Sequence, residues 1–377
     1  MWKTVKLRDV VSYEKVNGHG SNRPYVGMEH ISRETMKLVG SLEIQKKTSN
    51  SFKFDERHVL FGRLRPYLRK VFVPDFGGQC STEIFCLLPS DKVDRRFLAH
   101  WLLHPKVSTR INETSTGARM PRANMNAILD FDFPLPPLAE QERIVAKLDA
   151  AFAEIDRAVE TTSEHLKSIK QLFLTSLDTL VNADDLGESK PLGEICELAQ
   201  GLAINKGTKH LLVRNSSKPL IRIKDLVNET EEQFITDEYE NTKTEVNEED
   251  LIFTRTGSLG LVFRGRKGVL HNNSFKVTPS QGLSRDYLYW WLKNPSFLNI
   301  IHSISGKAAQ PDISHKLFKA QQIKIPTAVK QKDIVAKIEL LFEQTEKMKR
   351  INLYKLHQIH TFKSAMLSQE LQSSEAA

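Results

Sequence analysis

Residues 137–152, PLAEQERIVAKLDAAF, return 190 positions later as TAVKQKDIVAKIELLF at 327–342. Gln141 corresponds to Gln331, and the IVAK tetrapeptide that begins at Ile144 recurs unchanged at Ile334. A repeat of this length and order predicts a duplicated structural unit. A period of 190 residues is far too long for a solenoid, so we expect two copies of one domain, each followed by a helix.

The similarity extends upstream of both segments. RFLAHWLLHP at 96–105 corresponds to DYLYWWLKNP at 286–295, and STGARMP at 115–121 resembles ISGKAAQP at 304–311. Further upstream, DERHVLFGRLRP at 55–66 resembles NEEDLIFTRTGS at 247–258. Strand-like runs and one short apolar helix in each copy predict an α/β or α+β globule.

Two long helices are predicted after the globules. No Pro or Gly interrupts residues 139–181 or 329–371, and apolar residues spaced by three and four from Val145 to Leu180 form a heptad seam. The seam in the second helix is less regular between Met348 and Tyr354. Each helix would be about 65 Å long, so a globule can bridge the two only if they are antiparallel. The alternative is two helices that pack separately on their own domains.

The predicted fold is therefore of the α/β (α+β) class. It has two pseudo-symmetric globular domains and two long antiparallel coiled-coil helices. We place the first domain at 1–136, the central helix at 137–181, the second domain at 182–326 and the C-terminal helix at 327–377.

The charge pattern favours a polyanionic partner. The 377 residues carry a formal net charge of +8, and residues 1–136 alone carry +8. Residues 182–326 carry only +1 because ten acidic residues lie in 229–250; without that segment they carry +10. Both globules thus keep a basic remainder suited to phosphate, and the acidic stretch is expected to be a solvated loop facing away from DNA.

Catalytic motifs are missing from the sequence. It contains no phosphate-binding G-x-x-x-x-G-K-[ST] loop, no Asn-Pro-Pro-aromatic motif of amino-methyltransferases, and no complete nuclease or zinc-protease motif. Three cysteines without metal-ligand spacing indicate reduced thiols. No apolar run approaches a membrane span and no secretory signal is evident. We expect a non-catalytic cytoplasmic protein without a cofactor or metal of its own.

The duplicated helical motif is similar to the conserved regions of the specificity subunit of type I restriction–modification systems. The loops from Gly117 to Pro121 and from Gly306 to Pro311 also match, although the first is one residue shorter. Thr327 and Ala328 stand where this family often has Pro-Leu. The resemblance covers essentially the whole chain.

This resemblance implies a non-enzymatic subunit of a host-defence complex. Each globule would read one half of a bipartite double-stranded DNA target, and the helices would set the spacer. The helices would also dock two modification subunits, which use S-adenosylmethionine to methylate adenine. Restriction subunits would cleave unmodified DNA with ATP and Mg²⁺. The alternative is a symmetric scaffold for two proteins that reads no bases; an autonomous nuclease is a third hypothesis.

Candidate DNA contacts are basic, aromatic or amide side chains in the globules, since Arg can read guanine, Gln can read adenine, and Lys mostly grips phosphate. The candidates are Arg63, Arg65, Tyr67, Arg69, Lys70, Arg119, Arg122, Arg222, Lys224, Arg255, Thr256, Lys307 and Gln310. Candidate partner contacts lie outside the seam near each helix start. They are Gln141, Glu142 and Lys147, and their counterparts Gln331, Lys332 and Lys337.

Overall fold

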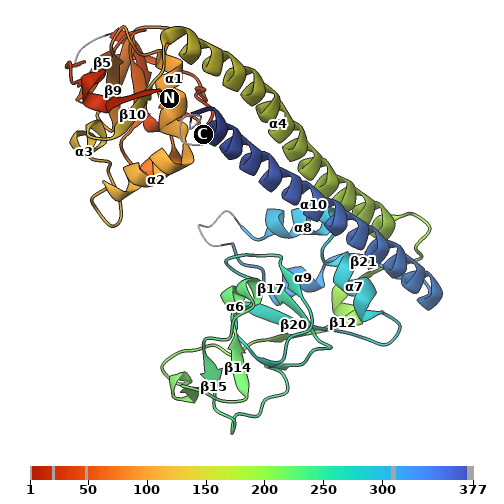
Figure 1. Cartoon of the computed structure of the whole chain (residues 1–377). Helices are drawn as coiled ribbons and strands as arrows, with labels where there is room; N and C mark the ends of the chain where they lie inside the picture. The colour runs from red at the N-terminus through yellow and green to blue at the C-terminus, as the bar shows by residue number, and fades with distance from the viewer. Residues whose placement is uncertain (1, 19–21, 47–49, 307–310, 372–377) are drawn as a thin grey trace. The chain divides into compact units, whose positions relative to one another are not determined.

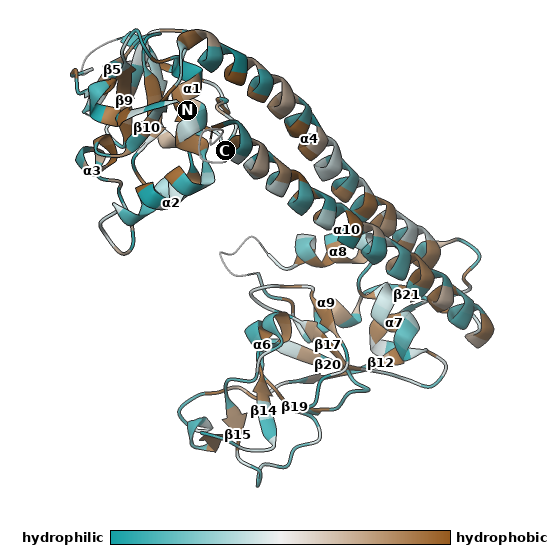
Figure 2. Cartoon of the chain, viewed as in Figure 1, coloured by the Kyte–Doolittle hydropathy of each residue, from teal (hydrophilic) through white to brown (hydrophobic). Residues whose placement is uncertain are grey.

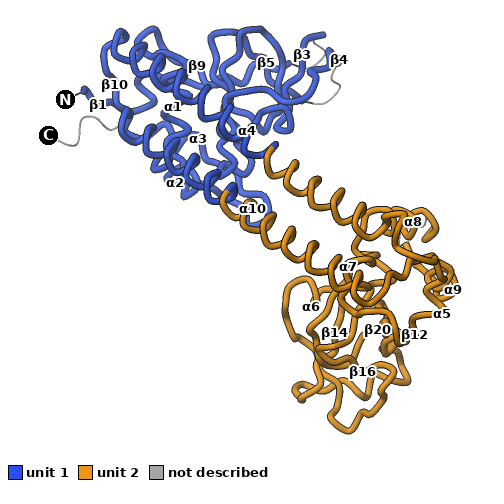
Figure 3. The backbone as a smooth tube through the Cα atoms, turned by 90° about the vertical axis from the view of Figure 1, so that its right-hand side faces the viewer, with its two compact units in different colours: residues 1–164, 352–377 blue, residues 165–351 orange. Residues whose placement is uncertain are grey.

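The computed structural model describes residues 2–18, 22–46, 50–306 and 311–371. Its packing divides the chain into two units, coloured separately in Figure 3. Unit 1 comprises residues 1–164 and 352–377, and unit 2 comprises residues 165–351. The long helices α4 (Leu138–Asn182) and α10 (Ala328–Leu371) each contribute one part to unit 1 and the other part to unit 2.

Unit 1 is built on two four-stranded sheets and one two-stranded ribbon (Figure 1). One sheet, in the order β2-β9-β6-β7, is antiparallel throughout. The other, β4-β3-β8-β5, contains the parallel pair β3–β8. Strand β1, the first strand of unit 1, pairs with β10, which lies just before α4 in the sequence. The strands are β1 (Lys3–Lys6), β2 (Val11–Glu14), β3 (Asn22–Val26), β4 (Ile44–Lys46), β5 (Ser51–Phe54), β6 (Val59–Gly62), β7 (Val71–Phe72), β8 (Gly78–Ser81), β9 (Ile84–Pro89) and β10 (Asp132–Leu135).

Three short helices of unit 1 are capped by side chains. They are α1 (Arg95–Leu103), α2 (Pro105–Glu113) and α3 (Met125–Leu129). Asp94 caps α1 by accepting from the Phe97 N–H at 2.8 Å, which satisfies a backbone donor that the first turn leaves unpaired. Phe97 and Trp101 then pack edge-on against Phe133 of β10, so α1 joins the sheet to the segment that leads into α4.

Unit 2 repeats most of this architecture, although its second sheet has five strands, in the order β13-β15-β14-β19-β16. Its sheet β12-β20-β17-β18 has the order of β2-β9-β6-β7, its parallel pair β14–β19 corresponds to β3–β8, and its ribbon β11–β21 corresponds to β1–β10. The strands are β11 (Ser189–Pro191), β12 (Cys196–Gln200), β13 (Leu212–Val213), β14 (Lys218–Ile221), β15 (Phe234–Ile235), β16 (Glu245–Val246), β17 (Leu251–Thr254), β18 (Val262–Phe263), β19 (Gly268–Leu270), β20 (Ser274–Pro279) and β21 (Gln322–Lys324). The helices are α5 (Leu192–Ile195), α6 (Ile223–Asn228), α7 (Arg285–Trp291), α8 (Pro295–Ile304) and α9 (His315–Lys319).

The long helices pair in antiparallel orientation. In unit 1, Lys147 of α4 contacts Glu370 of α10 at 2.6 Å, and Asp156 contacts Lys363 at 3.3 Å, so the residue numbers rise on one helix as they fall on the other. Apolar and polar residues alternate along both helices in Figure 2, as a seam requires.

The predicted fold class is confirmed, including both long helices and the duplication. The predicted seam of α4 is largely buried, with Leu148 fully so. The middle of α10 departs from a regular seam as its sequence indicated, because Met348, Ile351 and Tyr354 are all exposed.

Candidate nucleic-acid interface

Arg63 and Arg255 occupy the same backbone position in the two units. Arg63 follows β6; its N–H donates to the Glu83 carbonyl at 2.8 Å, and its carbonyl accepts from the Ala123 N–H at 3.0 Å. Arg255 follows β17 and makes the equivalent two bonds, donating to the Asn273 carbonyl at 2.9 Å and accepting at 3.1 Å. We call this pair of backbone bonds the arginine frame.

The side chains in the arginine frame also lie alike. The Arg63 guanidinium lies 5.9 Å from the centre of the Phe85 ring, and the Arg255 guanidinium lies 5.6 Å from the centre of the Phe275 ring. In each case the Nε atom is buried and has no hydrogen-bond partner. A buried donor without an acceptor destabilises a fold by roughly 1–3 kcal/mol. Both arginines are therefore held in positions that are unfavourable for folding.

The neighbours of the two arginines differ in charge. Isolated bridges pair Leu64 with Arg122 in unit 1 and Thr256 with Asp312 in unit 2, so Arg122 and Asp312 are equivalent positions. Arg122 donates to the Glu83 carboxylate at 2.8–3.0 Å. Asp312 instead accepts from Nη2 of Arg255 at 2.5 Å.

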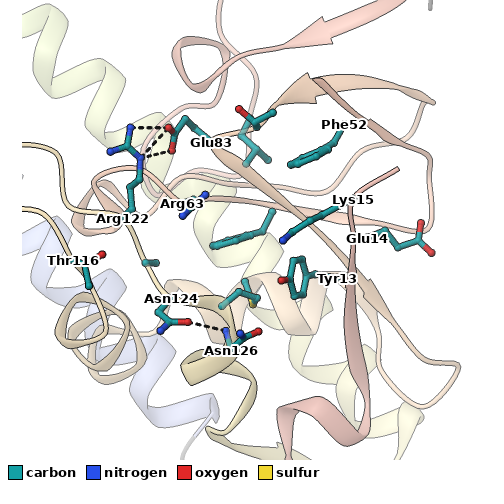
Figure 4. Close-up of a pocket in the computed structure, with 15 residues that line it drawn as sticks. Tyr13, Glu14, Lys15, Phe52, Arg63, Glu83, Thr116, Arg122, Asn124 and Asn126 are labelled. Carbon is teal, nitrogen blue, oxygen red and sulfur yellow. Dashed lines mark hydrogen bonds and ion pairs between the residues drawn. The ribbon is translucent and has the colours of Figure 1, made fainter. Parts of the chain in front are cut away.

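A hollow of about 450 Å³ opens beside Arg63 (Figure 4). The ion pair of Arg122 and Glu83 lies on one side of the Arg63 side chain, and Lys15 lies on the other. Among the described residues no ion pair forms at Arg63, and the two carboxylates that line this hollow, those of Glu14 and Glu83, pair with His58 and Arg122 instead. The hollow is lined by Tyr13, Glu14, Lys15, Phe52, Arg63, Thr82, Glu83, Ile84, Phe85, Thr116, Arg122, Ala123, Asn124, Met125 and Asn126.

The predicted basic segment of unit 1 is only partly available to a ligand. Arg65 and Tyr67 are exposed, and Arg65 lies in the left-handed region at φ 51° with its N–H donating to the Pro121 carbonyl. Arg69 lies 3.5 Å from Glu34. Lys70 points inward and donates to the Met28 carbonyl at 2.6 Å; burial, followed by the charge of a neighbouring arginine, lowers its pKa.

Two predicted contacts of unit 2 are engaged in internal ion pairs. Arg222 donates to Asp225 at 2.6 Å and to Glu232 at 3.2 Å, and Lys224 also pairs with Glu232. Burial alone would raise the pKa of Asp225, but the hydrogen bonds from Arg222 outweigh it and lower that pKa. A DNA phosphate would have to displace these carboxylates before it could contact Arg222 or Lys224. The structure therefore favours a DNA contact at these two residues less than the sequence alone does.

The remaining predicted contacts lie in or beside the two loops that match between the copies. Arg119 is exposed next to the hollow-lining segment of unit 1. Thr256 is partly exposed beside Arg255. Lys307 and Gln310 lie outside the described residues.

Two predicted partner contacts, Gln141 and Gln331, need correction because their side chains are buried. The Gln141 amide accepts from the Asp94 N–H at 2.8 Å and donates to the Lys92 and Pro136 carbonyls at 2.9 and 2.8 Å. Gln331 makes the same three bonds at 2.7, 2.9 and 2.8 Å. Their recurrence in the repeat therefore reflects an internal clamp between each long helix and the globule before it.

The four other predicted partner residues are exposed near the helix starts. Glu142 and Lys332 stand at matching exposed positions. Lys147 is half exposed while pairing with Glu370, and Lys337 pairs with Asp333 on its own helix at 2.8 Å. Whether they bind a partner stays a prediction.

An exposed apolar stripe on α10 was not identified in the sequence. Val329, Leu340, Ile351 and Phe362 follow at eleven-residue intervals and are 81%, 56%, 58% and 57% exposed. Eleven residues are close to three helical turns, so these side chains share one face of the helix. This eleven-residue spacing is present in the sequence, alongside the stronger periodicity of threes and fours that forms the seam. A row of exposed apolar side chains on one helix face is a candidate protein-binding surface, and whether it binds a partner stays a prediction.

Other site types are not evident in the part of the chain that the structure describes. No group of three or more His, Cys, Asp or Glu side chains there could hold a metal ion. No helix among the described residues is long and apolar enough to cross a membrane. The three cysteines are buried and unbridged. The acidic segment 229–250 supplies internal partners, as in the pairs of Lys218 with Glu245 and Lys276 with Asp250.

The fold defines a duplicated protein, with one α/β globule and one long helix in each half of the sequence. The chain belongs to the type I restriction modification DNA specificity domain family, whose model matches residues 1–168 and again residues 186–354.

Curated relatives share this description at low identity. The chain is 25% identical over 303 residues to the EcoKI type I restriction enzyme specificity subunit of Escherichia coli (strain K12), covering 72% of this chain and 64% of the relative. It is 26% identical over 169 residues to the EcoDI specificity subunit of Escherichia coli, covering 44% and 38%. The chain thus spans less than two thirds of the length of these curated relatives.

Solved structures show the same fold. A chain from a structural study of type I restriction–modification complex assembly and conformational transition matches with a TM-score of 0.82 at 20% identity, covering 98% of this chain and 97% of the other. The HsdS subunit from Thermoanaerobacter tengcongensis matches with a TM-score of 0.57 at 21% identity, with 98% and 96% covered.

Proposed function

We propose that this chain is the DNA specificity subunit of a type I restriction–modification complex. Each unit reads one half of a bipartite double-stranded DNA target. The observation that carries this proposal is the arginine frame, repeated with the same backbone bonds and aromatic contact in two units of one fold. Two equivalent recognition units on one chain suit a target with two separated half-sites.

The charge distribution supports a nucleic-acid partner. Residues 1–136 carry +8, and the acidic residues that offset the charge of residues 182–326 are concentrated in 229–250. Several of these acids pair with lysines and arginines of unit 2, including Glu245 and Asp250. A basic surface gives the sequence-independent attraction to phosphate on which base reading is superimposed.

The long helices serve as spacer and docking surface. Two modification subunits bind along them, and the exposed stripe at Val329, Leu340, Ile351 and Phe362 supports α10 as one such surface. The modification subunits use S-adenosylmethionine, and the restriction subunits use ATP and Mg²⁺. This chain contributes DNA recognition without catalysis. The assembly works in the cytoplasm, where its DNA substrate is found.

Selection of duplexes by the purified full chain from a random-sequence pool tests the proposal. We expect enrichment of a sequence with two defined parts and an undefined gap, and affinity that falls steeply with salt. A scaffold that reads no bases would enrich nothing over competitor DNA. Metal-dependent cleavage of DNA by the chain alone would favour an autonomous nuclease instead.

A further inference from the structure

The repeat provides an internal comparison of two sites built on the same backbone. In both units the arginine of the frame is held by the same two backbone bonds and lies over the corresponding aromatic ring, Phe85 or Phe275. The surroundings, in contrast, have diverged. Glu83 is replaced by Asn273, and Arg122 is replaced by Asp312. A constant arginine with exchanged neighbours is the pattern expected where two half-sites of different sequence are read.

The exchange changes what each site presents to a ligand. In unit 1, the Arg122 guanidinium is hydrogen-bonded to the Glu83 carboxylate. The side chains of Arg63 and Lys15 therefore face the hollow as hydrogen-bond donors (Figure 4). In unit 2, the Asp312 carboxylate lies 2.5 Å from Nη2 of Arg255. Among the described residues the Arg63 guanidinium therefore has no carboxylate bound to it, although acceptors of Glu14, Glu83 and Asn124 also line the hollow. The Arg255 guanidinium, in contrast, presents a donor bonded directly to a carboxylate acceptor.

Base edges differ in the same way. Guanine presents two acceptors, O6 and N7, in the major groove, and the arginine fork matches both. Adenine and cytosine each present an exocyclic amino group, which can donate a hydrogen bond to a carboxylate. A backbone phosphate fits the second site poorly, because Asp312 would repel the anion next to Arg255.

We propose that Arg63 and Arg255 are the equivalent base-reading side chains of the two units, and that Arg122 and Asp312 decide which base edge each arginine reads. Arg63 takes the two-acceptor edge of guanine. Arg255 and Asp312 together take an edge that carries an exocyclic amino group. This inference rests on the proposed DNA-reading function and adds to it the positions that determine specificity.

The test compares half-site preferences of full-chain variants in competition binding with duplexes selected by the unaltered chain. Arg63→Lys keeps the charge but loses the planar fork, so discrimination at one guanine of one half-site should fall about 5- to 150-fold. Arg255→Lys should cause a loss of the same order in the other half-site. Asp312→Asn should change the preferred base in the half-site that Arg255→Lys affects. It should leave the base preferences of the half-site read by Arg63 unchanged.

Controls separate local reading from folding and from general affinity. Each single variant should keep the preference of the unit that it does not touch, which serves as an internal measure of folding. Arg157→Gln removes an exposed positive charge on α4 that pairs with Glu154, and should leave both half-site preferences unchanged.

Three results would overturn the inference. One is a uniform loss of affinity for all sequences in Arg63→Lys and Arg255→Lys, which would make both arginines phosphate contacts. Another is loss of both half-sites from a single variant. The third is an unchanged base preference in Asp312→Asn. A failure of the proposed function would look different, because the unaltered chain would then select no two-part sequence at all.

Discussion

The buried glutamine at the start of each long helix should be among the most sensitive polar positions in the chain. Gln141 is fully buried and makes three hydrogen bonds of 2.8–2.9 Å; those with Asp94 and Lys92 join α4 to the loop before α1, and the third is to the Pro136 carbonyl just before α4. At about 1 kcal/mol net for each bond, Gln141→Ala should destabilise unit 1 by about 3 kcal/mol. Gln331→Ala should do the same in unit 2, where the three bonds are 2.7–2.9 Å long.

Hydrogen exchange is the appropriate assay, because a chain of two units that share helices need not unfold in one step. The Asp94 and Ser284 N–H groups donate to the two glutamines. We expect each N–H to exchange about a hundredfold faster in the corresponding variant and at the original rate in the other. Exposed neighbours provide matched controls, since Glu142→Ala and Lys332→Ala should change stability by no more than about 0.5 kcal/mol.

An isosteric variant gives this prediction a pH dependence. Gln141→Glu replaces the amide that donates to two carbonyls with a carboxyl group in a fully buried site. Burial and facing carbonyls raise the folded-state pKa of such a carboxyl. Its folded state then binds more protons than its unfolded state, so stability falls as the pH rises above about 4.3. If Gln141→Ala and Glu142→Ala proved equally stable, or if Gln141→Glu showed no pH dependence, the clamp would be refuted.

Four further predictions concern the charges and the helices. Burial alone would raise the pKa of Asp149, but hydrogen bonds from His100 and Arg96 lower this pKa to about 2. The ionised Asp149 therefore stabilises the fold above about pH 4, and this contribution is lost as the pH falls toward 2. Asp149→Asn should flatten that part of an acid-unfolding curve. Arg65→Gln and Arg119→Gln, both at exposed sites, should each reduce the slope of log affinity against log salt by about 0.9 if the residue contacts a phosphate; an unaltered slope would exclude that contact. Leu340→Glu with Ile351→Glu should prevent co-purification of a modification subunit while leaving thermal unfolding nearly unchanged, since both side chains are more than half exposed; retained co-purification would remove the stripe from the interface. Insertion of seven residues into both α4 and α10, which preserves the seam, should lengthen the selected spacer and keep both half-sequences; a changed half-sequence would show that helices and readers are not separate elements.

The duplication could be recognised from sequence because its signals are local or periodic. The IVAK repeat at Ile144 and Ile334, the absence of Pro and Gly from both helices, and the seam spacing all follow from helix geometry. The α/β character of the globules followed from short apolar runs such as those that became β6 and β17. The antiparallel pairing followed from chain connectivity alone.

The candidate interface was harder, because charge in a sequence does not reveal the partner of a charge. Arg63 and Arg222 looked alike as basic residues near strands, yet Arg222 is held by Asp225 and Glu232, while no described residue forms an ion pair with Arg63. The repeat of Gln141 and Gln331 near the two helix starts predicts equivalent contacts with two identical partners, yet both side chains are buried. A polar residue at a helix start can face a partner protein or clamp the helix to its own domain, and sequence periodicity does not distinguish the two.

The sequence by itself thus determined that the chain is a doubled unit with two long helices, since repetition and helical period are properties of order along the chain. Only the tertiary structure decided which polar groups are already satisfied. It paired Arg122 with Glu83, paired Asp312 with Arg255, and left a hollow beside Arg63. These partners lie between 39 and 57 positions apart in the sequence, and they meet because strands and loops from separate segments converge on one sheet edge in each unit.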